Sequence, residues 1–327
     1  MSNNASDAAA RASLAATSKL SVQQLEGAQF GAEIIGLDPL NISAADNALI
    51  WQTYAERNGL LCFSFDRLLE SEELHELTVI FGEKEFAPGV INGIGKKTPA
   101  GEEHLSVDEQ VSRLRADGID PYMTFLGNLN PKTLDAKVVD KKFFGEWEWH
   151  SDMSYIEVPP TFSLLHARQI PAAGGDTGFC SQVMAAKALP DDLRARVQHQ
   201  KIKHDSTYGS SGIARPGMTA PASPIEAIGY PHPVLRRVPT TGDEAMFLGR
   251  RTNGYATGMA LDDSEALLDE LWAHATQEQF CYHHQWQVGQ CVVWDNRMMM
   301  HMRHPFDESL ARFMWRTQTK GEEVITA

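Results

Sequence analysis

The stretch CVVWDNRMMMH, at residues 291–301, constrains the fold more than any other part of the chain. An apolar run, a short polar turn and a second apolar run follow one another there, which predicts a buried strand, a tight Asp-Asn turn and a return strand. Shortly after it, ARFMWR at 311–316 reads as a further strand, with two arginines on one face and Phe313 and Trp315 on the other. The second half of the chain is therefore expected to be rich in strands.

Helical patterns occupy other parts of the chain. SAADNALIWQTYAERNG, at 43–59, begins with a capping serine, repeats apolar residues every three or four positions and ends at a glycine, so it predicts a helix. Similar features predict helices at 70–82, at 182–199 with a break at Pro190, and at 262–276. Strands are expected within 28–39, at 60–65 and around MTFLGNLNP at 123–131, whereas the rest of 92–145 and residues 205–245 show little periodicity. These patterns indicate one domain of mixed composition.

Composition limits the classes of partner. The chain has 327 residues, 43% of them hydrophobic, which is typical of a globular protein. Its formal net charge of −14 argues against nucleic acid or an anionic membrane as the main partner. No apolar run approaches the roughly 18 to 20 residues of a membrane span. The Ala/Ser-rich residues 1–18 are expected to be a disordered tail, which leaves residues 19–327 as a single domain.

The cysteines indicate the compartment. Four are widely spaced and none forms a CxxC pair, so the sequence predicts neither a disulfide framework nor a zinc finger. We expect reduced thiols in a cytoplasmic protein. A monomer and a homo-oligomer both fit the sequence.

Chemistry is concentrated in GEWEWHSDMSY, at residues 145–155. On an extended chain His150 and Asp152 point to the same face and present an imidazole beside a carboxylate. With one more histidine from a distant strand they would form a 2-His-1-carboxylate face, which suits non-haem Fe(II) and leaves metal positions open. Taken alone, such a pair more often forms a structural hydrogen bond.

Two arginines in the last predicted strand point to an anion. Arg312 and Arg316 lie among bulky hydrophobic residues, where a charged group needs a partner. The guanidinium fork matches a carboxylate with two parallel hydrogen bonds. The alternative is a pair of arginines at the surface or in salt bridges.

Several motifs in order resemble one family. WHSD at 149–152, GGDT at 174–177 and WDNRMMMH at 294–301 are followed by arginines 11 and 15 positions after His301, and Thr177 lies 27 positions after His150. In these motifs and spacings the sequence is similar to the taurine dioxygenase and 2,4-dichlorophenoxyacetate dioxygenase group of Fe(II)/2-oxoglutarate oxygenases. The resemblance runs from about residue 20 to 320, with 92–145 and 205–230 poorly matched.

The resemblance implies a mainly β fold with flanking helices, a double-stranded β-helix or distorted jelly roll. It implies that His150, Asp152 and His301 bind Fe(II), that Thr177 and Arg312 hold the distal carboxylate of 2-oxoglutarate, and that Arg316 meets an anionic substrate. The reaction it implies consumes O2, releases succinate and CO2, and is supported by ascorbate in vitro. Asp152 favours hydroxylation, because halogenating relatives have a small residue at that position.

Departures from the family pattern bear on the substrate. Taurine dioxygenase has an asparagine where this chain has Glu146, which either attracts a cationic or donating part of the substrate or is solvated. Trp147 and Tyr155 are candidate substrate contacts or ordinary core residues, and the GRR at 249–251 is an anion contact or a surface segment. The irregular residues 205–230 suggest a lid over bound substrate. We expect Met298, Met299 and Met300 to fill the interior; rivals of His301 as third ligand are His283, His284 and His304.

The expected substrate is a small organic acid, such as an aryloxyalkanoate or aromatic carboxylate, which the enzyme hydroxylates and thereby can cleave. Alternatives within the same chemistry are a sulfonate or an amino-acid-like compound. Two alternatives in other classes are a non-catalytic cupin-like metal-binding protein and a zinc hydrolase. Hydroxylation and desaturation are both outcomes that this chemistry offers.

Overall fold

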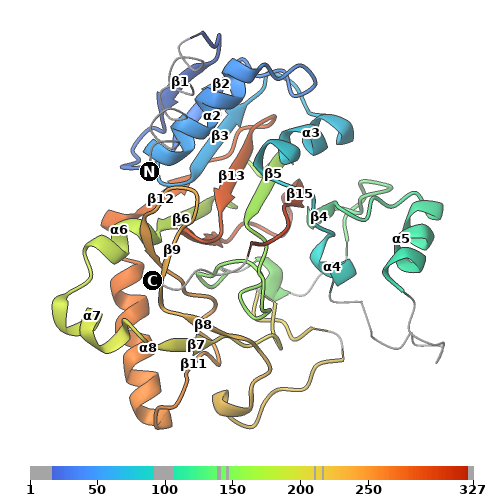
Figure 1. The fold of residues 1–327 in the computed structure, drawn as a ribbon. Coiled ribbons are helices and arrows are strands. Elements are labelled where there is room, and N and C mark those ends of the chain that lie inside the picture. Colours follow the sequence, from blue (N-terminus) through green and yellow to red (C-terminus); the bar gives the residue numbers. More distant parts are fainter. Residues whose placement is uncertain are drawn as a thin grey trace.

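The computed structural model describes residues 17–91, 106–137, 141–144, 147–209, 211–215 and 217–322. Most of the tail predicted at residues 1–18 therefore lies outside the described residues, although the hydroxyl of Ser18 donates a hydrogen bond to the Asp46 carboxylate at 2.6 Å. Within the described ranges, no helix has both the length and the apolar character that crossing a membrane requires. The fold is mainly β with flanking helices, as predicted (Figure 1).

Seven strands form the larger sheet in the order β1-β2-β3-β13-β5-β15-β4. Neighbouring strands are antiparallel except β2 and β3, which are parallel. β13 lies between two other strands of this sheet and is buried along its whole length, which explains its continuous apolar sequence. The bounds are β1 (Ser21–Gln24), β2 (Ala32–Ile35), β3 (Leu60–Ser64), β4 (Thr124–Gly127), β5 (Phe162–Gln169), β13 (Cys291–Asp295) and β15 (Phe313–Gln318).

A smaller sheet of three strands, in the order β12-β6-β14, carries much of the predicted site. Its strands are β6 (Thr177–Ser181), β12 (Cys281–His284) and β14 (Met299–Arg303). The sequence correctly predicts strands on both sides of the Asp-Asn turn. The return strand, however, leaves the larger sheet and pairs with β6, so β13 and β14 are not a hairpin.

Helices cover the outside of both sheets. α2 (Ala44–Glu56) and α3 (Ser71–Phe81) lie against the larger sheet, whereas α6 (Gln182–Lys187), α7 (Asp191–Val197) and α8 (Leu261–Ala275) group beside the smaller one (Figure 1). Capping boxes at Ser43 and Glu70 begin α2 and α3, and a break at Pro190 separates α6 from α7, all within the predicted ranges. Met298, Met299 and Met300 are fully buried, as expected of interior residues.

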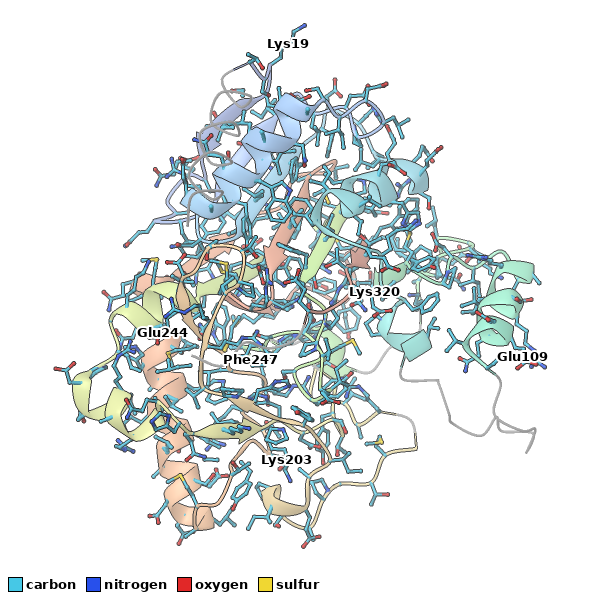
Figure 2. The ribbon with its side chains drawn as sticks, in the orientation of Figure 1. Lys19, Glu109, Lys203, Glu244, Phe247 and Lys320 are labelled. Carbon is cyan, nitrogen blue, oxygen red and sulfur yellow. The ribbon has the colours of Figure 1, made fainter. Side chains whose placement is uncertain are left out.

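Two stretches predicted to be irregular contain regular structure. Within 92–145 the chain forms α5 (Val107–Ala116), which begins with a capping box between Ser106 and Glu109, and the short α4 (Pro88–Ile91) lies just before this stretch. Only Val111 of α5 is buried, so the helix lacks the apolar stripe that periodicity detects, and Glu109 lies at the margin of the molecule (Figure 2).

Residues 201–256 form short strands in two small sheets. Those strands are β7 (Lys201–Lys203), β8 (Pro231–Pro233), β9 (Leu235–Arg237), β10 (Glu244–Met246) and β11 (Tyr255–Ala256). Strands of two or three residues are too short to show alternation, which is why the sequence does not reveal them. Single turns of 3₁₀-helix complete the chain at η1 (Lys141–Phe144), η2 (Pro224–Glu226) and η3 (Glu278–Phe280).

The last strand also differs from its prediction. β15 begins at Phe313, so Arg312 precedes it, and the pairing with β5 shifts register between Phe313 and Met314. A bulge of this kind interrupts the alternation of side chains. The expectation that Arg312 and Arg316 share one straight strand is therefore wrong, and each arginine has its own surroundings.

Candidate functional site

Backbone pairing brings His150 and His301 together. His301 belongs to β14, and its carbonyl and N–H bond to the N–H and carbonyl of His150 at 3.0 and 2.8 Å. Directly opposed residues of an antiparallel pair have neighbouring side chains. The two imidazole rings accordingly lie with their centroids 4.3 Å apart.

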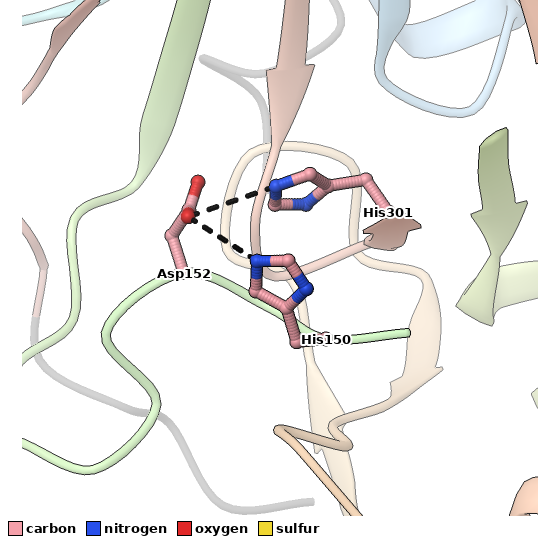
Figure 3. Close-up of side chains that lie close together, drawn as sticks. All are labelled: His150, Asp152 and His301. Carbon is pink, nitrogen blue, oxygen red and sulfur yellow. Dashed lines mark ion pairs between the residues drawn. The ribbon is translucent and has the colours of Figure 1, made fainter. Parts of the chain in front are cut away.

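Asp152 completes a cluster of three buried polar side chains (Figure 3). Its Oδ1 lies 3.9 Å from Nε2 of His150 and 3.7 Å from Nε2 of His301. Met153, with a φ of 47°, turns the chain immediately after this aspartate. All three ligand atoms lie within 4.8 Å of one another, and in the part of the chain that the structure describes no other group of three such residues is found. The predicted ligand set is therefore assembled in space.

The second carboxylate oxygen of Asp152 is held by other residues. Arg316 in β15 reaches Oδ2 at 2.6 Å, and the hydroxyl of Ser163 in β5 donates to the same atom at 2.8 Å. Ser163 in turn accepts hydrogen bonds from Arg316 and from Asn296, each at 3.0 Å. Because Oδ2 is engaged in this way, Oδ1 is directed towards the two histidines, and such supporting contacts orient metal ligands.

The cluster has the protonation that metal binding needs. Nδ1 of His150 donates to the carbonyl of Glu148 at 2.7 Å, so the lone pair is on the Nε2 that faces Asp152. Burial lowers the pKa of His301 to about 4 and holds the pKa of His150 well below its usual value. Burial opposes ionisation of Asp152, but the Arg316 guanidinium, the two histidines and the Ser163 hydrogen bond together outweigh burial and lower the pKa of this carboxyl. Two neutral imidazoles and one carboxylate therefore face one another at neutral pH.

A second polar region lies at the GGDT motif. Gly175 has a φ of 74°, and a Cβ placed on it would be 3.3 Å from Cδ and Nε of Arg312, so the glycine makes room for this arginine. Arg312 is 3% exposed, and its Nε has no hydrogen-bond partner among the residues that the structure describes. Burial lowers the pKa of Arg312 to about 10, partly offset by nearby Asp176. Thr177, two residues after Gly175, accepts a hydrogen bond from the Trp286 indole at 3.0 Å.

Arg303 is a residue of this region that the sequence analysis misses. It lies directly opposite Thr177 in the pairing of β14 with β6, and it is buried. Burial and the charge of Arg312 lower the pKa of Arg303 to about 9. The signal was available, because Arg303 lies two residues after His301 and so shares its strand face. Two buried arginines that repel each other form a place suited to an anion.

The other predicted contacts have separate surroundings. The Arg303 guanidinium lies over the Trp147 ring, with its Cζ 4.7 Å from the ring centroid, so Trp147 is beside the region of Arg303 and Arg312. Tyr155 lies under Arg215 at 4.3 Å, and its carbonyl accepts from the backbone N–H of Tyr230, so it contacts residues 205–230. Glu146 lies outside the described residues.

The GRR segment divides between interior and surface. Arg250 is buried, and its Nε lies 3.8 Å from the Glu148 carboxylate. The pKa of His150 is lowered mainly by burial, then by the charge of His301, and the charge of Arg250 adds a smaller effect in the same direction. Arg251 instead forms ion pairs at 2.6 Å with Glu265 and with Asp269.

The rival histidines lie elsewhere. Nδ1 of His283 is 2.7 Å from Nε2 of His304, and His284 bonds to Tyr282 and Gln290. None of these three joins the cluster of His301.

A buried pair of histidines and one carboxylate in a mainly β chain defines a 2-His-1-carboxylate site, the class that binds a divalent metal with positions left open. Residues 21–318 match the family described as taurine catabolism dioxygenase TauD, TfdA family. The chain belongs to this family and is an alpha-ketoglutarate-dependent dioxygenase. The resemblance inferred from the motifs is thereby confirmed, and the alternatives of a cupin-like binding protein and a zinc hydrolase are not favoured.

Two curated relatives are similar over most of their length. The (S)-phenoxypropionate/alpha-ketoglutarate-dioxygenase of Sphingobium herbicidovorans is 30% identical over 235 residues, which cover 68% of this chain and 80% of the relative. The alpha-ketoglutarate-dependent 2,4-dichlorophenoxyacetate dioxygenase of Cupriavidus pinatubonensis is 30% identical over 211 residues, covering 61% and 71%. The crystal structure of AAD-2 with Mn(II) and N-oxalylglycine aligns with a TM-score of 0.71 at 24% identity, covering 95% of this chain and 99% of AAD-2.

Proposed function

We propose that this chain is an Fe(II)- and 2-oxoglutarate-dependent dioxygenase that hydroxylates a small organic acid, such as an aryloxyalkanoate or an aromatic carboxylate, with release of succinate and CO2. The observation that carries the proposal is the buried His150–Asp152–His301 cluster together with two buried arginines, of which Arg303 lies two residues after His301 on β14. The cluster supplies neutral and anionic donors, and the arginines supply a counter-charge for a dicarboxylate.

The donor set fits Fe(II). Two imidazole nitrogens and one carboxylate oxygen are typical ligands of non-haem iron, whereas thiolate or thioether donors would suit copper or zinc. In the proposed role Nε2 of His150, Nε2 of His301 and Oδ1 of Asp152 bind the metal, which activates O2 when bound. Arg316 and Ser163 keep Oδ2 of Asp152 occupied, and this orients the carboxylate.

The region of Arg312 fits the distal carboxylate of 2-oxoglutarate. Its guanidinium is buried, and within the described part of the chain its Nε has no hydrogen-bond partner, which costs free energy unless an anion binds. We assign the carboxylate contact to Arg312 and Thr177, with Arg303 adding positive charge. Trp147 stacks on Arg303, so we place it on this side of the site rather than against the substrate.

The substrate side is assigned to Arg316, Tyr155 and Arg250. The relatives above are named for phenoxypropionate and 2,4-dichlorophenoxyacetate, which are aryloxy acids. Arg316 is already bonded to Asp152, so a substrate carboxylate would share its guanidinium with a metal ligand. Arg250 is a second buried cation near His150, and Glu146 remains a candidate contact from the sequence.

The same proposal extends to the architecture. We infer that the larger and smaller sheets, linked by the passage of β13 into β14, form an open version of the distorted jelly roll. Residues 19–327 would then be a single domain. In support, β1 pairs with β2 at one end of the chain, and Glu322 bonds to Arg297 at the other.

A screen of substrates tests the proposal. Protein supplied with Fe(II), ascorbate, O2 and 2-oxoglutarate is given aryloxyalkanoates, aromatic carboxylates, sulfonates and amino acids in turn, and succinate is measured. We expect acid-dependent succinate release with an aryloxy or aromatic acid. The His301→Ala variant is the control, because it removes one proposed ligand. Release with sulfonates or amino acids alone would retain the chemistry and overturn the substrate assignment.

A further inference from the structure

Two cysteines face each other across neighbouring strands of the smaller sheet. Cys180 in β6 and Cys281 in β12 are direct partners in the antiparallel register, and their sulfur atoms lie 2.9 Å apart. Directly opposed Cα atoms are about 4.5–5.5 Å apart, within the range of about 4.4–6.8 Å that a disulfide spans. Both cysteines are free thiols in this structure, and the proposed dioxygenase chemistry does not use them.

The two thiols differ in access. Cys180 is fully buried and donates to the carbonyl of Ala275 at 2.8 Å, whereas Cys281 at the start of β12 is partly exposed. Two causes raise the pKa of the Cys180 thiol: the larger is the hydrogen bond from Cys281, and the smaller is burial. A small oxidant from solvent therefore meets Cys281 first, and Cys180 is the thiol placed to resolve the product.

The remaining cysteines provide an internal comparison. In the pairing of β13 with β3, Cys291 is opposite Phe63 and Cys62 is opposite Val292. Successive side chains of a strand point to opposite faces, so Cys62 and Cys291 lie on different faces of the larger sheet. Both are buried, and they cannot join without disrupting the sheet.

We propose that Cys180 and Cys281 form a reversible disulfide, a thiol-oxidation site that links β6 to β12. With hydrogen peroxide as the oxidant, the Cys281 sulfur attacks one oxygen, the O–O bond breaks, and a sulfenic acid and one water form. The Cys180 sulfur then attacks the Cys281 sulfur, the S–O bond breaks, and a second water leaves with the Cys180 proton. Two thiols lose two electrons and two protons, and one peroxide becomes two waters.

The disulfide would act on the strand that carries Thr177. β6 runs from Thr177 to Ser181 and pairs with β12 on one side and with β14, which carries His301, on the other. Oxidation would thus fasten the central strand of the smaller sheet to its neighbour at the end away from Thr177, which itself pairs with His284.

The test counts and maps thiols in the full-length protein. The reduced chain is treated with hydrogen peroxide in the presence of a chelator, which keeps peroxide from reacting with iron, and is then denatured, alkylated and digested. We expect two of the four thiols to be lost, one cross-linked peptide pair containing Cys180 and Cys281, and full recovery with dithiothreitol. The Cys62→Ser variant should keep the cross-link, and Cys281→Ser should abolish it.

Four alkylated thiols after peroxide treatment of the folded wild-type protein would overturn the proposal. So would a cross-link that joins other cysteines, or one that persists in Cys281→Ser. Because the main measurement is made on the wild-type chain, a folding defect in a variant does not affect it.

Discussion

Arg312→Met is expected to have two effects of opposite sign, on stability and on cosubstrate binding. The arginine is 3% exposed, and its Nε has no hydrogen-bond partner in the described residues. In our proposal its counter-charge is the distal carboxylate of 2-oxoglutarate. The ligand-free protein therefore bears the cost of a buried charge that the bound protein relieves. Methionine keeps much of the volume and removes the charge.

The magnitudes follow from the surroundings of Arg312. Burial lowers its pKa from 12.5 to about 10, and each pH unit corresponds to about 1.4 kcal/mol, so the buried charge costs about 3 kcal/mol in the ligand-free protein. Arg312→Met should raise the free energy of unfolding of the ligand-free protein by up to that order. A lost charge-assisted contact of about 1.5–3 kcal/mol should weaken 2-oxoglutarate binding by about 10- to 150-fold.

Denaturant unfolding and calorimetric titration with 2-oxoglutarate measure the two effects. Arg297→Met is the matched control, because Arg297 is also buried but pairs with Asp295 at 2.7 Å. Breaking a buried pair leaves an uncompensated charge, so this control should lower stability by about 3–5 kcal/mol. If Arg312→Met instead destabilised the ligand-free protein and left 2-oxoglutarate affinity unchanged, Arg312 would be a structural residue and the proposed cosubstrate site would be wrong.

Four further predictions concern the metal ligands, the substrate arginine, acid stability and the irregular segment. His301→Ala should abolish Fe(II) binding and turnover, while His304→Ala keeps both; equilibrium dialysis distinguishes them, and the reverse result would refute the ligand assignment. Arg316→Ala should raise the KM for the organic acid about 10- to 150-fold and, because Arg316 also holds Asp152, weaken Fe(II) binding; steady-state kinetics in which only the KM for 2-oxoglutarate changes would contradict this. Burial lowers the pKa of four histidines to about 3 or 4, namely His166, His204, His232 and His284. Below about pH 6.5 these histidines stay neutral in the folded protein but take up protons in the unfolded chain. The free energy of unfolding should therefore fall between about pH 6.5 and 4, by up to about 1.4 kcal/mol per pH unit for each histidine. His284→Gln should reduce that slope in denaturant titrations, and an unchanged slope would count against it. Residues 205–230 contact Tyr155 through Arg215 and Tyr230, so bound 2-oxoglutarate and acid should slow limited proteolysis there; equal cleavage rates would argue against a lid.

Local sequence predicted those parts of the site that depend on short spacings. His150 and Asp152 are two residues apart, and the structure brings them to one place, although Asp152 begins a turn and does not continue an extended strand. His301 was recognisable because the Asp-Asn turn sets its distance from a buried strand. In each case the deciding contact is short in sequence or fixed by a motif.

Contacts that depend on which strands pair could not be predicted from short spacings or motifs. The sequence does not show that β14 pairs with β6, so neither the approach of Arg303 to Thr177 nor the bond from Arg316 to Asp152 was predicted. The pairing of β12 with β6 is also absent from the sequence pattern, so the sequence suggests isolated thiols and does not reveal that Cys180 and Cys281 lie opposite each other. The register shift between Phe313 and Met314 could not be predicted either, because no residue of ARFMWR marks the position of a bulge.

The most direct test of the central claim is an anaerobic titration of the Fe(II)-loaded protein with 2-oxoglutarate, followed by visible absorption. If His150, Asp152 and His301 hold Fe(II) with positions open, and Arg312 and Thr177 hold the cosubstrate, a weak metal-to-ligand charge-transfer band should appear and saturate. The band should be absent in His301→Ala. A folded wild-type protein that binds Fe(II) and shows no such band at saturating 2-oxoglutarate would contradict the account.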